Sequence, residues 1–152
     1  MTPGALRLAE SIIKNMVTKQ KKQVVGKKAK AGSMTKVAVL GFGTVGSSVA
    51  RVLAASRFPG VELTHIFNRN VERKRNSPAA KVVPPSVVWT DNIDVILRSD
   101  VDIVIELMGG LNPIEGWIRK ALVAGKSVVT ANKQLIAYRG TGLSCGQVGG
   151  YG

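Results

Sequence analysis

The hydrophobic positions of this 152-residue chain form short continuous runs that alternate with stretches of helical spacing. Residues 36–40 (KVAVL) and 101–109 (VDIVIELMG) are almost wholly apolar, which is typical of parallel strands buried on both faces. Residues 44–56 and 113–126 repeat their apolar positions every three or four residues, as amphipathic helices do. The alternation over residues 36–137 predicts an α/β fold, a Rossmann-type doubly wound parallel sheet with helices on both faces.

The intervening segments continue the same alternation. We predict a strand over 61–68, a short strand within 84–90 after a polar, proline-bearing loop, a short helix over 92–99 and a last strand over 127–132. Thr90 and Asp91 are expected to begin the short helix, because such side chains cap helix N-termini. Pro113 near the first turn and Gly125 at the end delimit the helix over 113–126.

The two ends of the chain differ from this pattern. Residues 1–35 begin with a possible short amphipathic helix and continue into a lysine-rich linker with little to bury, so we predict a basic, disordered extension. Residues 138–152 hold six glycines in their last thirteen positions, which predicts an irregular tail. The predicted organisation is therefore an extension (1–35), one folded domain (36–137) and a Gly-rich tail (138–152).

The net charge of the chain adds information about possible binding partners. The chain carries a net charge of +13 with a pI near 10.4, which points to nucleic acid, a membrane surface or anionic small molecules as partners. Residues 1–35 contribute +7 of this excess, from eight Lys or Arg and one acid. That stretch lacks interleaved aromatic and arginine residues, so we do not expect a nucleic-acid partner.

Other totals restrict the class further. No apolar run approaches the length that spans a bilayer, so no membrane association is expected. The single cysteine, Cys145, excludes an internal disulfide and favours a cytoplasmic location. We assign no metal site.

The residues after the first predicted strand carry the clearest chemical signal. They fit G-x-G-x-x-G, with a strand before and a helix after, and are Gly41, Phe42, Gly43, Thr44, Val45 and Gly46. In this pattern the first glycine permits a tight turn, the second lets a pyrophosphate approach the backbone, and the third lets the helix pack on the strand. We predict dinucleotide binding, with a glycine-rich turn that binds nothing as the alternative.

The end of the second predicted strand bears on the choice of dinucleotide. NAD-specific domains place Asp or Glu there to accept from the ribose 2′-hydroxyl, whereas this chain has Asn68, Arg69 and Asn70, with a basic cluster at 73–75. A guanidinium binds a 2′-phosphate bidentately. We therefore predict NADP as the cofactor, with NAD as the alternative, and Arg69 as the contact. The basic cluster is interpreted as a solvated helix start.

Two further motifs narrow the class. IELMGG (105–110) and VVTANK (128–133), together with GFGTVGSSV and NRNVERKR, resemble the N-terminal half of homoserine dehydrogenase over about two thirds of the chain. The resemblance implies NAD(P)-dependent interconversion of aspartate 4-semialdehyde and homoserine, a small-molecule reaction in threonine and methionine biosynthesis.

The resemblance also implies roles for individual residues. Residues 41–46 match the phosphate-binding loop and Arg69 matches the basic residue after the second strand. The turn after the fourth strand, near the nicotinamide ribose, is matched by Leu107, Met108 and Gly109. Lys133 matches a lysine beside the cofactor and the reacting carbon, and is the predicted catalytic residue. A lysine at the carboxyl end of a parallel strand would stabilise the negative charge that hydride transfer develops on oxygen; an ordinary surface lysine is the alternative.

Three polar residues near these motifs receive no catalytic role. Glu106 is interpreted as a buried carboxylate that anchors a turn. Asn132 either holds its turn or touches the cofactor. His65 lies within the second predicted strand and is interpreted as structural.

The chain also departs from the family. Nothing after Ala137 corresponds to the family's second domain, which carries most substrate contacts, so we expect a cofactor-binding half that is incomplete for catalysis and prone to self-association. The alternatives are a non-catalytic module that senses NADP(H), a different NADP-dependent reductase, and a basic nucleic-acid-associated protein.

Overall fold

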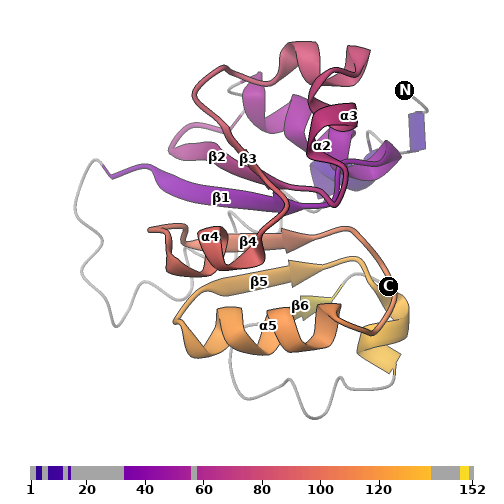
Figure 1. Cartoon of the computed structure of the whole chain (residues 1–152), viewed down its shortest axis with the longest axis vertical. Coiled ribbons are helices and arrows are strands. Elements are labelled where there is room, and N and C mark those ends of the chain that lie inside the picture. The colour runs from indigo at the N-terminus through magenta and orange to yellow at the C-terminus, as the bar shows by residue number, and fades with distance from the viewer. Residues whose placement is uncertain are drawn as a thin grey trace.

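The structure is a computed structural model, and it describes residues 3–4, 7–11, 14, 33–55, 58–137 and 148–150. A parallel sheet in the order β3-β2-β1-β4-β5-β6 forms its centre, and Figure 1 shows the arrows of β1, β4 and β5 pointing the same way. The strands are β1 (Thr35–Leu40), β2 (Val61–Phe67), β3 (Val88–Thr90), β4 (Ile103–Glu106), β5 (Ser127–Thr130) and β6 (Val148–Gly150). The order reverses direction between β1 and β4, as in the predicted doubly wound fold.

Helices cover both faces of the sheet. They are α2 (Thr44–Ala54), α3 (Val71–Arg75), α4 (Ile93–Arg98) and α5 (Ile114–Val123), with a 3-10 helix η1 (Pro78–Val82). Residues 133–137 are also helical. None of the helices in the described part of the chain is long and apolar enough to cross a membrane.

Two apolar layers result from the alternation of side chains along β1. Val37 and Val39 pack in the layer that α2 covers, while Ala38 and Leu40 pack in the layer that α4 and α5 cover. All four are almost completely buried. Each fully buried Val or Leu side chain stabilises a fold by roughly 1.5–3 kcal/mol, so the uninterrupted apolar strand is explained by burial on both sides.

At the N-terminal end the structure agrees with the short helix considered there, and at the C-terminal end it differs from the expected irregular tail. Within the basic extension, residues 7–11 are helical and Ala9 is buried in the α2 layer, whereas the lysine-rich linker lies outside the described residues. Within the Gly-rich tail, predicted to be irregular, Val148–Gly150 pair with β5 as β6. Strand pairing uses backbone groups, so glycine-rich residues at an edge can form it without apolar side chains.

The start of α4 and the loop before β3 also differ from the sequence-based expectation. Asn92 caps α4, its Oδ1 accepting from the backbone N–H of Asp94 at 2.9 Å, and Thr90 acts one step earlier by accepting from the N–H of Asn92 at 3.0 Å. The helix therefore begins one residue later than predicted, with Asn92 rather than Asp91 as its N-cap. The polar loop before β3 contains α3 and η1, both too short to show a clear apolar period.

The register of the sheet aligns the carboxyl ends of its strands. Hydrogen-bonded pairing places five residues in one row, namely Thr90, Phe67, Leu40, Glu106 and Thr130. The segments that follow these residues leave the sheet at a common edge. Ligands of open parallel sheets bind at this edge, outside the point where the strand order reverses.

Candidate functional site

The predicted site residues all follow this row of strand ends. Gly41 comes directly after Leu40, and Leu107 directly after Glu106. Arg69 comes two residues after β2 ends, and Lys133 three residues after β5 ends. The structure thus brings the glycine loop, the basic residue, the 107–109 turn and the lysine to one edge of the sheet.

Each glycine of the loop has a distinct geometric reason. Gly41 has φ +100°, and a Cβ there would lie 3.0 Å from Cγ of Met108. A Cβ on Gly46 would lie 2.0 Å from the carbonyl oxygen of Gly41, so only glycine lets α2 approach the loop this closely. A Cβ on Gly43 would meet nothing within 4 Å. The space in front of Gly43 is therefore open to a ligand.

The first turn of α2 has the features of an anion-binding helix N-terminus. Its N-cap is Gly43, no side chain caps the first turn, and no acid lies within that turn. The first N–H groups of a helix have no intrahelical partner, and the helix dipole adds positive potential at this end. Thr44 is exposed beside them. Unpaired N–H groups and an absent side-chain cap form a phosphate-binding arrangement.

Two loop residues face the core instead. The ring of Phe42 is 2% exposed and packs edge-on against Trp89, with 4.8 Å between ring centroids. Val45 is half-buried and packs in the α2 layer. At these two positions only the backbone is available to a ligand.

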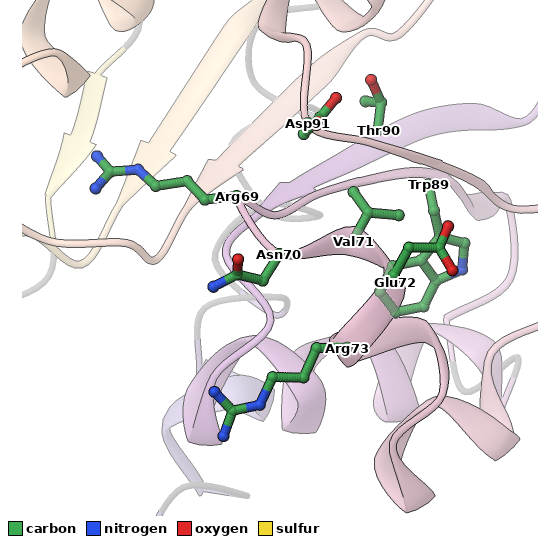
Figure 2. Close-up of a pocket in the computed structure, with 8 residues that line it drawn as sticks. All are labelled: Arg69, Asn70, Val71, Glu72, Arg73, Trp89, Thr90 and Asp91. Atoms are coloured by element: carbon green, nitrogen blue, oxygen red, sulfur yellow. The ribbon is translucent and has the colours of Figure 1, made fainter.

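A pocket of about 520 Å³ opens at the ends of β2 and β3, and its lining residue Trp89 packs against Phe42 of the loop. Figure 2 shows its lining residues, Arg69, Asn70, Val71, Glu72, Arg73, Trp89, Thr90 and Asp91. In this view the guanidinium groups of Arg69 and Arg73 extend to one side, apart from the carboxylates of Glu72 and Asp91. Both arginines are exposed, and neither forms an ion pair with a residue that the structure describes.

The turn after β4 is built around a buried carboxylate. Glu106 is 0% exposed; its Oε1 accepts from the backbone N–H groups of Met108 at 2.7 Å and Gly109 at 3.0 Å. Its Oε2 accepts from the hydroxyl of Thr130 at 2.5 Å. Glu106 therefore anchors the turn, as the sequence suggested, and also reaches the neighbouring strand.

The turn after β5 is held by Asn132. Its Oδ1 accepts from the N–H of Leu135 at 3.1 Å, which caps the helical residues 133–137, and its Nδ2 donates to the carbonyl oxygen of Gly110. The side chain is 6% exposed. Of the two roles considered for Asn132, these contacts supply the first, holding the turn.

Lys133 begins the helical residues 133–137 and is exposed. Its ammonium group forms no ion pair within the described ranges. His65 differs, since it is half-buried and its Nδ1 lies 2.9 Å from the hydroxyl oxygen of Thr64. Burial lowers the pKa of His65, which suits a neutral, structural imidazole.

Sequence reasoning missed two parts of this site. Thr130 lies within the TANK motif but received no role, and Trp89 was not placed beside the glycine loop. Thr130 could have been found, because a polar residue ending an otherwise apolar run must find a hydrogen-bond partner when buried. The Trp89 contact depends on the β2–β3 register, which a three-residue strand does not reveal in sequence. The described residues hold no cluster of three or more His, Cys, Asp or Glu suited to a metal.

Strand order, open helix start and glycine geometry together define a dinucleotide-binding domain of the Rossmann class. Comparison with known proteins gives the family. The family described as "Homoserine dehydrogenase, NAD binding domain" matches residues 41–146, and the chain belongs to this family.

Individual relatives agree. Homoserine dehydrogenase of Corynebacterium glutamicum is 40% identical over 111 residues, covering 70% of this chain and 24% of that protein. The Mycobacterium tuberculosis enzyme is 43% identical over 108 residues, covering 66% and 23%. A crystal structure of Staphylococcus aureus homoserine dehydrogenase superposes with a TM-score of 0.62 at 33% identity, covering 73% and 29%. The chain thus spans about a quarter of the length of these curated relatives.

Proposed function

We propose that this chain is the cofactor-binding half of a homoserine dehydrogenase and that it binds NADP(H). The observation that carries the proposal is the start of α2, where Gly43 leaves both space and unpaired N–H groups for a pyrophosphate. The family match supports a nicotinamide cofactor. The choice between NADP and NAD depends on the pocket beside the loop.

The pocket favours a 2′-phosphate. No acid occupies positions 68–70 at the end of β2, and the side chain of Asn68 accepts from the N–H of Asn70 at 2.9 Å to shape the turn. Arg69 and Arg73 are among the residues that line the pocket, both are exposed, and neither has an ion-pair partner among the described residues. Arginine matches phosphate geometry bidentately, so these groups suit a 2′-phosphate better than a 2′-hydroxyl.

We propose that Lys133 serves the reaction of the whole enzyme. In the reductive direction, bound NADPH would supply a hydride to the aldehyde carbon of aspartate 4-semialdehyde, and negative charge would develop on the aldehyde oxygen. An ammonium group at the carboxyl end of β5 would stabilise that charge. The family match is to an NAD-binding domain alone, and we expect the 152-residue chain to bind cofactor without turnover.

A second candidate is an NADP(H)-binding module without catalysis. It would use the same glycine loop and open start of α2, without a catalytic role for Lys133. Both candidates require the same cofactor site, and they differ in whether Lys133 serves a reaction of the whole enzyme.

We also propose a cytoplasmic location, which the single cysteine supports, and self-association. Apolar side chains remain exposed on the edge strand and on the outer helices, at Val88, Val95 and Val123. Concentration-dependent mass in sedimentation velocity would support self-association, and a monomer at all concentrations would contradict it.

The test is a fluorescence titration of the purified chain with NADPH and NADH, followed by addition of aspartate 4-semialdehyde. We expect tighter binding of NADPH and no oxidation of the cofactor. Turnover would show that the chain completes its own active site. Failure to bind either dinucleotide would overturn the proposed function.

A further inference from the structure

Glu106 is a fully buried carboxylate that no catalytic or cofactor-binding assignment uses. All of its hydrogen bonds go to three donors, the N–H groups of Met108 and Gly109 and the hydroxyl of Thr130. No lysine, arginine or histidine pairs with it in the described part of the chain. Burying a carboxyl group removes it from water at a cost in free energy, and mere stability could be met by apolar packing.

Thr130 connects this carboxylate to the next turn. It is the register partner of Glu106 across β4 and β5, and it is 0% exposed. While its hydroxyl donates to Glu106, its Oγ1 accepts from the N–H of Asn132 at 3.0 Å. Asn132 then donates back to the carbonyl oxygen of Gly110. The hydrogen bonds form a closed circuit through both turns.

The circuit lies beside the glycine loop, on the side away from the pocket. Met108, whose N–H is held by Glu106, contributes the atom nearest to a Cβ built on Gly41. A dinucleotide with its pyrophosphate at α2 and its adenosine over the ends of β2 and β3 extends across the point where the strand order reverses. Its nicotinamide half then lies over the ends of β4 and β5, where both turns are.

We infer that Glu106 and Thr130 are positioning residues for the nicotinamide half of the cofactor. They hold the 107–110 turn and the 131–133 turn as one unit, so that the backbone near Met108 and the ammonium of Lys133 are presented together. The pyrophosphate and adenosine contacts do not depend on this unit. This inference rests on the proposed function.

The test compares Thr130→Val with the matched control Thr130→Ser. Valine keeps the volume but removes both hydroxyl bonds of the circuit, whereas serine keeps them. Each variant is titrated with NADPH and with adenosine 2′,5′-bisphosphate, a probe that lacks the nicotinamide half. We expect T130V to weaken NADPH binding by about tenfold, the scale of one buried hydrogen-bond partner lost, and to leave the probe within about twofold. T130S should bind both ligands like the wild type.

Glu106→Gln gives a second variant in case T130V unfolds. Glutamine can still accept from one turn but presents an N–H group where Thr130 donates, so the same selective loss is expected. Equal weakening of both ligands would overturn the inference, because it would show a general structural role. Unchanged NADPH binding in folded T130V or E106Q would overturn it too.

Amide hydrogen exchange separates this inference from the proposed function. In ligand-free T130V, the amides of Met108, Gly109 and Leu135 should exchange faster than in T130S, while amides of β1 and β4 keep wild-type rates. Unchanged exchange at these three amides would show that the turns are not coupled. If the wild-type chain binds NADPH no more tightly than adenosine 2′,5′-bisphosphate, this inference is overturned while the proposed function stands. A wild-type chain that binds neither ligand would overturn both.

Discussion

The amino ends of the strands form one edge of the sheet, the amino edge, and their carboxyl ends form the opposite one, the carboxyl edge. Both edges carry charged residues, but the partners of those residues differ. At the amino edge, Lys36 pairs with Asp100, and the ammonium of Lys126 donates to the carbonyl oxygens of Ser99 and Val101 at 2.7 and 2.9 Å. Asp102 likewise accepts from the backbone N–H of Lys36 at 2.8 Å. The cations of this edge are satisfied by the protein itself.

At the carboxyl edge the arrangement is reversed. Arg69, Arg73 and Lys133 are exposed and have no ion-pair partner among the residues described. The carboxylate of Glu106, which is buried, accepts hydrogen bonds from backbone N–H groups and pairs with no cation among those residues. The start of α2 adds further unpaired donors. Exposed cations without a neighbouring carboxylate leave positive potential at the carboxyl ends of the strands, which attracts an anionic ligand, so the difference between the edges favours this one as the binding surface.

The largest expected effect comes from separating two glycines of the loop. Gly46→Ala would place a Cβ 2.0 Å from the carbonyl oxygen of Gly41, and should lower the free energy of unfolding by about 3 kcal/mol or prevent folding. Gly43→Ala meets no protein atom within 4 Å and has φ −89°, so stability should be retained. Binding of NADPH to G43A should nevertheless fall by at least about tenfold, because the new methyl group occupies the ligand's approach. Urea denaturation and titration distinguish the two effects, and an equally stable G46A would contradict the close-approach argument.

The next effect concerns the free cations of the carboxyl edge. Arg69→Gln should weaken NADPH binding by about 10- to 100-fold, the value of a charge-assisted hydrogen bond, and leave NADH binding unchanged. Arg75→Gln is the matched control, since Arg75 is exposed on α3 but does not line the pocket. Calorimetric titration of both variants with both cofactors is the measurement. Equal losses of NADPH and NADH affinity in R69Q would argue against 2′-phosphate recognition.

A change at the amino edge should affect stability alone. Lys126→Met leaves two carbonyl oxygens without their charged donor, and should lower the free energy of unfolding by about 1–3 kcal/mol with no change in NADPH affinity. Lys120→Met, an exposed substitution on α5, should change stability by less than about 0.5 kcal/mol. Thermal unfolding with and without NADPH measures both quantities. Weaker cofactor binding in K126M would contradict the claim that the amino edge contributes to stability alone.

The smallest effect is a pH dependence at His65, a residue of β2 whose pKa is influenced by charged residues of the amino edge. Burial lowers the pKa of His65 below its ordinary 6.5, with Asp100 opposing the shift and Lys126 and Lys36 adding to it. The unfolded chain then binds a proton more readily than the folded one, so stability falls as pH drops through 6.5 toward the folded pKa. His65→Gln should reduce this slope. The pKa of Asp100 is itself lowered by its hydrogen bond with Lys36, and that contribution is lost only at more acidic pH. Urea midpoints measured between pH 7.5 and 5.5 test the prediction; identical slopes would contradict it.

The sequence predicted most of the fold because its signals are local. The apolar runs at 36–40 and 127–132 and the spacing of 44–56 and 113–126 follow directly from burial on two faces of a sheet. The structure confirms a doubly wound sheet built from these elements. The glycine loop was equally accessible, because its spacing lies directly between a predicted strand and a predicted helix.

The remaining features depend on contacts between distant parts of the chain. Glu106 and Thr130 lie 24 residues apart and meet only through strand register. The pairing of β6 with β5 is a backbone interaction that leaves no apolar pattern. Lys126 was only the last residue of a predicted helix, yet it is 6% exposed and its ammonium group donates to the carbonyl oxygen of Ser99 at the end of α4. Such roles are decided by tertiary structure and were not visible in spacing.

The central claim is that the carboxyl edge alone binds the cofactor. Its most direct test is an amide chemical-shift titration of the 152-residue chain with NADPH. We predict saturable shifts at Gly41, Gly43, Arg69 and Met108, with the amides of Lys36, Asp102 and Lys126 unmoved. Shifts at the amino edge, or no shifts in the glycine loop at saturating NADPH, would contradict the account.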